Sequence, residues 1–178
     1  MIWLWSFIAY SFSGFLLEMA FGLAVGGRQD RKGLWVLPLC PVYGVGACFI
    51  VLFTGQEAAY PPAVFVLGGL TATVVEYCAA LYHERVLGVS FWSYEDLPGN
   101  IQGKICIPFS LAWGVLSLGL VYWVHPALVP WLARIPDPVS FLAMATVSTD
   151  GLLTAALLRR GGDTASLRWY EQKSGPPA

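Results

Sequence analysis

The stretch from residue 62 to residue 82 reads PAVFVLGGLTATVVEYCAALY and carries one charged side chain, Glu76. An α-helix needs about 20 predominantly apolar residues to cross the roughly 30 Å hydrocarbon core of a bilayer, so this stretch predicts a membrane-spanning helix. Other apolar stretches of similar length lie at residues 2–25, 36–55, 106–125 and 138–158. We therefore predict an all-α integral membrane protein with five transmembrane helices.

The composition excludes an ordinary soluble domain. Hydrophobic residues make up 57% of the chain and charged residues 12%, whereas soluble domains carry about 25% charged residues. The mean hydropathy is +0.63 and the formal net charge is −1, with no strongly basic segment for nucleic acid. The expected surroundings are the lipid bilayer, and the expected location is the cell (cytoplasmic) membrane, crossed several times.

The basic residues predict the orientation. Lys and Arg are retained on the cytoplasmic side of membranes. With five crossings, nine of the ten fall on one side and only Arg134 on the other. The nine are Arg28, Arg31, Lys32, Arg85, Lys104, Arg159, Arg160, Arg168 and Lys173. We expect the N-terminus outside and the C-terminus in the cytoplasm.

The connections differ in character. Those at 56–61 and 126–137 are short, and their prolines are expected to stop one helix and start the next. Residues 83–105 form a longer cytoplasmic loop that is amphipathic and aromatic, suited either to capping the bundle or to contacting a partner. We expect residues 1–158 to form the helical bundle and the polar tail, 159–178, to be disordered.

Carboxylates lie inside three of the predicted spans. These residues are Glu18, Glu76 and Asp150. Placing an ionisable side chain in hydrocarbon costs several kcal/mol of free energy unless it binds a partner or water, so each is a candidate functional residue. All three lie about 6 to 8 residues before the inner helix ends, which places them roughly 9 to 12 Å deep at 1.5 Å per residue. They would share one level of the membrane.

Prolines fall at a similar depth. Pro38, Pro41 and Pro108 would free backbone carbonyls, which is tolerated in a membrane only where protein or water satisfies them. We therefore predict a polar vestibule open to the cytoplasm, with the three acids at its base. Its rim would consist of Arg31, Lys32, His83, Glu84, Arg85, Asn100 and Lys104.

Structural explanations remain open for these residues. Glu18 or Glu76 would lock the bundle if either paired with a basic residue of the rim, and Asp150 would mark a kink. The cysteines and glutamates match no standard metal motif, so we expect neither a metal nor a cofactor. No phosphate-binding GxxxxGK[ST] loop or hydrolase signature occurs, which disfavours an enzyme.

Several short motifs together resemble a known family. They are SFSGFLLE (11–18), RKG (31–33), PLCPVYGVG (38–46), EY (76–77), WSY (92–94), Asn100 and GKIC (103–106). This combination resembles the ABC-transporter type IV membrane proteins, a CmpB-like permease family, from the first span to about His125. The resemblance implies a permease-like subunit and marks as site residues Glu18, Cys40, Tyr43, Glu76, Tyr77, Asn100 and Lys104. Asp150 rests on the argument from depth alone.

Three functions remain open. The first is a transport subunit that binds a small polar or cationic solute, or protons, at the inner-leaflet carboxylates. Five short spans enclose little volume, so a homo-oligomer or a cytoplasmic partner such as a separate ATPase would complete it. The second is a membrane-embedded enzyme acting on a lipid or lipid-linked substrate from the cytoplasmic side. The third is a non-catalytic assembly or regulatory protein.

Overall fold

The computed structural model describes residues 1–24, 35–55, 58–162 and 164–167. Its elements are α1 (Ile2–Ala24), α2 (Pro41–Thr54), α3 (Pro61–Tyr82), the π-helical turn η1 (His83–Leu87), α4 (Ile107–Gly119), the π-helical turn η2 (Leu120–Val124), α5 (His125–Leu132), α6 (Asp137–Gly161) and the 3₁₀ turn η3 (Thr164–Leu167). Within the described ranges the one β-type pairing is an isolated bridge between Ile101 and Ile105. The all-helical class is confirmed.

Helices of membrane-spanning length and composition occur four times in the described residues. They are α1, α3 with η1, the continuous helix α4–η2–α5, and α6. Helix α2 is apolar but has only 14 residues, or about 21 Å at 1.5 Å per residue, against a hydrocarbon core of roughly 30 Å. These helices are those of a multi-pass membrane protein, while the fifth crossing and the outward N-terminus stay predictions.

The second predicted span begins later than the sequence indicated. Residues 35–40 are not helical, and α2 starts at Pro41, in the first turn, where a missing amide costs nothing. Pro108, the second residue of α4, also lies in the first turn of its helix. Each of these two prolines lies in the first turn of a helix, so the expectation that Pro41 and Pro108 free backbone carbonyls at the depth of the acids was wrong.

The fourth span is longer than predicted. The helix continues through Pro126 and Pro130 to Leu132, so the expectation that these prolines end it was wrong. The π-helical turn η2 directly precedes α5, and the amide of His125 bonds to the carbonyl of Leu120. Such a wider turn loosens the hydrogen-bond ladder beside Pro126, which lacks an amide and crowds the preceding turn.

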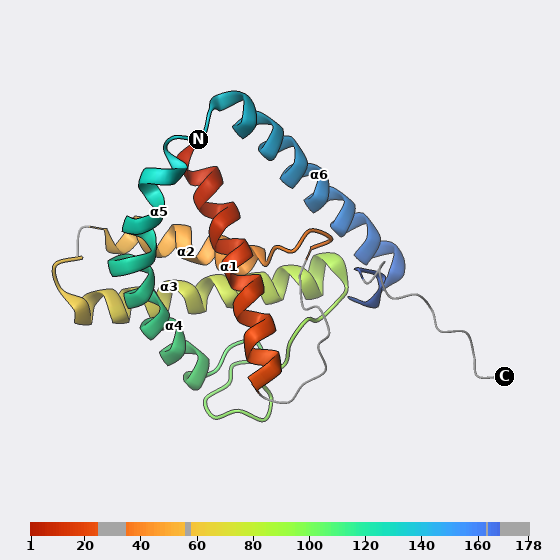
Figure 1. Cartoon of the computed structure of the whole chain (residues 1–178). Helices are drawn as coiled ribbons and strands as arrows, with labels where there is room; N and C mark the ends of the chain where they lie inside the picture. Colours follow the sequence, from red (N-terminus) through yellow and green to blue (C-terminus); the bar gives the residue numbers. More distant parts are fainter. Residues whose placement is uncertain (25–34, 56–57, 163, 168–178) are drawn as a thin grey trace.

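Close helix contacts depend on glycine. Figure 1 shows α2 and α3 side by side, crossing α1 and α4 at a steep angle. A β-carbon at Gly14 of α1 would collide with the ring of Tyr43 on α2. A β-carbon at Gly69 of α3 would lie 3.2 Å from the carbonyl oxygen of Ser110 and 3.3 Å from the Cα of Gly114, both on α4. Small residues allow such approach in lipid, where apolar burial alone gains little.

Helix α6 is arranged differently. It diverges from α1 along its length (Figure 1), and its apolar side chains are largely exposed, with Leu142 at 69% and Leu152 at 74%. Its C-terminal half contacts other parts of the protein again, and Leu158 near its end packs with Leu87, Val89 and Leu167. The helix thus runs to Gly161, three residues past the predicted end of the bundle, and Leu167 of the predicted tail is buried. The tail residues 163 and 168–178 lie outside the described residues.

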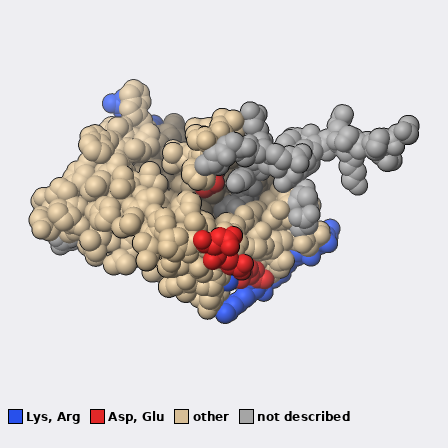
Figure 2. Space-filling view, turned by 90° about the horizontal axis from the view of Figure 1, so that it is seen from below, with Lys and Arg blue, Asp and Glu red and all other residues tan. Residues whose placement is uncertain are grey.

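The loop between η1 and α4 is folded against the helices. Gly88, Gly99 and Gly103 all have positive φ, the left-handed conformation that favours glycine, and Gln102 shares it at 53°. Figure 2 shows acidic side chains gathered on the face seen from below, with basic ones along an edge. Glu95 and Asp96 are the exposed acids of this loop.

Candidate functional site

Glu76 is held by neutral hydrogen-bond donors. It lies on α3 and is 4% exposed. The hydroxyl of Tyr94, from the loop, donates to its Oε1 at 2.9 Å. The indole Nε1 of Trp113, from α4, donates to its Oε2 at 2.9 Å. Both carboxylate oxygens are therefore engaged by side chains from two different elements.

Glu18 is joined to Tyr43. The Tyr43 hydroxyl on α2 donates to Oε1 of Glu18 on α1 at 2.6 Å. The Tyr43 ring also meets the Trp113 ring edge-on, with 5.0 Å between centroids. A chain of contacts thus runs from Glu18 to Glu76, and we call Glu18, Tyr43, Glu76, Tyr94 and Trp113 the carboxylate cluster.

The tyrosine of the loop remains a donor in this setting. Burial raises the pKa of Tyr94, and the negative charges of Glu76 and Glu18 raise it further. Its ring also stacks on Phe109 of α4, with 4.7 Å between centroids. The phenol therefore keeps its proton near neutral pH, and its O–H donates a hydrogen bond to Glu76.

Cys40 borders the cluster. It is 3% exposed and belongs to a small apolar group with Phe15. Its backbone amide donates to the carbonyl of Ser11 at 3.0 Å, which ties the start of α2 to α1. The geometry gives Cys40 a part in placing Tyr43, three residues further along.

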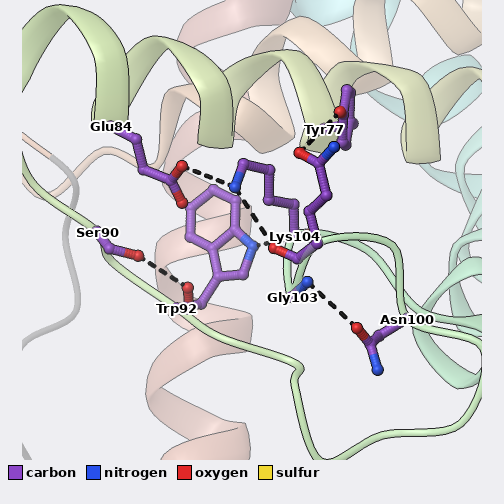
Figure 3. A network of polar contacts seen from close by, with 8 residues as sticks. Tyr77, Glu84, Ser90, Trp92, Asn100, Gly103 and Lys104 are labelled. Atoms are coloured by element: carbon purple, nitrogen blue, oxygen red, sulfur yellow. Dashed lines mark hydrogen bonds and ion pairs between the residues drawn. The ribbon is translucent and has the colours of Figure 1, made fainter.

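Lys104 is engaged elsewhere. Its Nζ lies 2.7 Å from Oε2 of Glu84 and donates to the Gln102 carbonyl at 3.4 Å. Trp92 donates through Nε1 to the backbone carbonyl of Lys104 at 3.0 Å. Figure 3 shows the Lys104 side chain extending toward Glu84 beside the Trp92 ring. We call these contacts, with those of Tyr77 and Asn100, the loop network.

Tyr77 and Asn100 belong to the same network (Figure 3). The Tyr77 hydroxyl donates to the Gln102 side chain at 3.2 Å. The Asn100 amide donates to the carbonyls of Glu95 and Leu97, and its Oδ1 accepts from the Gly103 amide. Asn100 thus closes the turn of the loop and supports its shape.

Asp150 binds the backbone. It is 6% exposed, and both its carboxylate oxygens accept from the amide of Leu37, at 3.2 and 3.3 Å. One turn later, Thr154 Oγ1 accepts from the amide of Val36 at 3.2 Å. Both contacts fix the non-helical segment that leads into α2. Of the three predicted acids, the structure joins Glu18 and Glu76 through the cluster and gives Asp150 this separate partner.

Two members of the cluster were not among the predicted site residues. Tyr94 lies within the WSY motif and Trp113 in the middle of the fourth predicted span, where a polar-tipped aromatic side chain usually seeks a partner. The indole N–H of Trp113, placed deep in a predicted span, was the feature of the sequence that could have indicated a polar partner there. Of the predicted rim, Arg31 and Lys32 lie outside the described residues.

The part of the chain that the structure describes holds no group of three or more His, Cys, Asp or Glu side chains arranged for a metal ion. The chemistry that the carboxylate cluster can perform is the uptake and release of a proton, or the coordination of a cation by carboxylate and phenol oxygens.

Comparison with known proteins agrees with the sequence motifs. A family model described as "Putative ABC-transporter type IV" matches residues 5–155. The match extends past His125 and includes most of α6, so the resemblance covers more than the motifs indicated. Neither curated proteins nor solved structures gave a match. The matched region includes the whole carboxylate cluster, the loop network and Asp150, and the chain belongs to the ABC-transporter type IV family.

Proposed function

We propose that the protein is a permease-like transport subunit in which the carboxylate cluster takes up a proton or a small cation. The observation that carries this is Glu76, which is 4% exposed inside a span and bonded to the neutral donors Tyr94 and Trp113. Neutral donors orient a carboxylate without cancelling its charge.

The basic residues near the cluster support the proposal. The ion pair found among the described residues joins Lys104 to Glu84, not to Glu76 or Glu18. A buried charge without an opposite charge is costly, and the cost falls when a proton or a cation neutralises it. Glu18, which is joined to Glu76 through Tyr43 and Trp113, would be the second binding position for that proton or cation.

The loop network suits a role in assembly. It gives the loop of residues 88–106 a fixed shape, and the exposed Glu95 and Asp96 add charge to that face. The chain carries no phosphate-binding loop, so energy for transport would come from an ion gradient or from a separate cytoplasmic ATPase seated on this face. A second copy of the chain would enlarge the enclosed path.

Uptake into vesicles tests the proposal. The protein is reconstituted into liposomes containing a pH-sensitive dye, and proton or monovalent cation flux is measured for the wild type, Glu76→Gln and Glu18→Gln. Each substitution keeps the shape of the side chain and removes its charge, so flux is expected to fall at least tenfold. Glu95→Gln, on the exposed loop, is the control and should retain wild-type flux. Equal flux in all four proteins would refute the proposal.

A further inference from the structure

A large apolar groove runs between α2 and α3. Its volume is about 700 Å³, within the range of small-molecule sites, and its walls are formed almost wholly by apolar side chains of the two helices. Leu70 and Val74 on its α3 wall are 61% and 60% exposed, and Phe49 on its α2 wall is 42% exposed. The groove is therefore open along its side, toward the space that lipid occupies around a membrane protein.

The groove is separate from the carboxylate cluster. Neither Glu18 nor Glu76 contributes to its lining. Glu76 points instead toward Trp113 on α4, whereas the neighbouring Val75 lines the groove. A ligand in the groove would thus occupy a different face of α3 from the site proposed for ions.

One end of the groove carries a buried polar group. His83 lines it where α3 passes into the π-helical turn η1, and the side chain is 8% exposed. Its Nδ1 has no hydrogen-bond partner among the described residues, and the ring packs edge-on against Phe91 at 4.8 Å and Trp92 at 6.0 Å between centroids. Turning the ring over exchanges Nδ1 with a carbon, so either edge of the imidazole can present a nitrogen to the groove.

We propose that this groove binds one acyl chain of a membrane phospholipid, with the lipid's polar end at His83. The polarity of the groove changes along its length as that of a phospholipid does. The walls are apolar from Leu70 onward, and the hydrogen-bonding ring of His83 lies at the end nearest the loop. The distance from Leu70 to His83 along α3 is about 20 Å at 1.5 Å per residue, long enough for much of an acyl chain. The head group or ester region supplies the hydrogen bond that His83 Nδ1 does not find among the described residues, relieving the cost of a buried unpaired nitrogen.

The side chains of the walls favour a lipid over another helix. Helices associate in membranes through small residues that let backbones approach. The open side of this groove is bordered by Phe49, Phe53, Leu70 and Tyr82, which hold a second backbone away. A flexible chain one methylene wide can follow the floor between them.

Photolabelling in bilayers tests the proposal. Two probes are used in nanodiscs: a phosphatidylethanolamine with a diazirine in one acyl chain, and an alkane with the same diazirine. Labelled peptides from the wild type should concentrate on α2 and α3. Val74→Trp fills the groove and should lower labelling of these helices by both probes at least fivefold. Val115→Trp, on α4 with 61% exposure, is the matched control and should leave it unchanged.

His83→Phe separates the polar end from the apolar walls. It keeps a ring of similar shape and removes both nitrogens, so labelling by the phospholipid should fall about threefold while labelling by the alkane stays constant. Thermal unfolding of each variant verifies that the fold is retained. Labelling spread evenly over all lipid-facing helices, insensitivity to Val74→Trp, an equal response of both probes to His83→Phe, or crosslinks to a second copy through the groove would overturn the proposal.

Discussion

Glu76 and Asp150 are buried to nearly the same extent, at 4% and 6% exposure, yet their surroundings differ in kind. Glu76 accepts from two side chains, Tyr94 and Trp113, on separate elements. Asp150 accepts from the backbone amide of Leu37. Side-chain donors can turn away when an ion arrives, whereas a backbone amide cannot leave without moving the chain. Burial alone therefore does not identify a binding carboxylate, and the nature of the donor is more informative.

The largest expected effect concerns ion flux and separates the two acids directly. Glu76→Gln and Asp150→Asn are both shape-conserving and both remove one buried charge. We expect Glu76→Gln to abolish flux in the liposome assay and Asp150→Asn to retain at least half of it, because only Glu76 is proposed to carry the ion. A comparable loss in both variants would erase the distinction between the two regions.

The next effect concerns the free energy of unfolding, and here Asp150 is the residue that matters. Asp150→Ala leaves the Leu37 amide without this buried acceptor, which costs about 1–3 kcal/mol. Asp150→Asn keeps an acceptor oxygen and should lose less than half as much. The free energy of unfolding, measured by denaturant titration in mixed micelles, should reveal the difference. If the alanine and asparagine variants unfold alike, the contact with Leu37 does not stabilise the entry to α2.

A smaller effect measures the coupling inside the carboxylate cluster. Tyr94→Phe removes one donor to Glu76, and Glu76→Gln keeps an acceptor oxygen but removes the charge, so a double-mutant cycle of the two measures how much of their hydrogen bond depends on that charge. The coupling free energy is expected at about 0.5–1.5 kcal/mol, the usual difference between a hydrogen bond to a charged acceptor and one to a neutral acceptor. A matched cycle of Tyr77→Phe with Glu76→Gln should give no coupling, since Tyr77 bonds to Gln102. Equal coupling in the two cycles would contradict the assigned contacts.

The smallest effect belongs to the loop network. Glu84 is about one-third exposed, so solvent screens its ion pair with Lys104. Lys104→Met, which keeps the length of the buried stem, is expected to change the free energy of unfolding by no more than about 0.5 kcal/mol. Ion flux should remain near the wild-type value. A large loss of flux would show that Lys104 takes part in ion movement and does not only support the loop.

The apolar stretches predicted the helices because membrane-spanning segments are determined by local composition. Their ends were harder to predict. Pro41 begins α2, whereas Pro126 lies within a continuous helix. The π-helical turn before Pro126 widens the helix there and accommodates a residue that has no amide to donate. The sequence alone does not distinguish these two prolines. Whether a wider turn forms beside a proline depends on how the helix packs against other helices.

The sequence singled out some members of the carboxylate cluster and missed others. The rarity of carboxylates in spans singled out Glu18 and Glu76, and the structure joins them through shared aromatic neighbours. Depth along the helix also singled out Asp150, but depth says nothing about which face of a helix a residue occupies. Trp113 was overlooked because an indole in an apolar segment resembles any other large hydrophobic residue until its N–H is seen to meet an acid.

The contact between Gly14 and Tyr43 has a consequence for relatives of this protein. The ring lies where a β-carbon of residue 14 would be, and the hydroxyl of that ring reaches Glu18 one turn further along α1. A chain with alanine or anything larger at 14 has no room for an aromatic ring at 43, and without the ring the acid at 18 loses its donor. Across homologues these three positions should consequently vary as a unit, glycine, tyrosine and glutamate being gained or lost together.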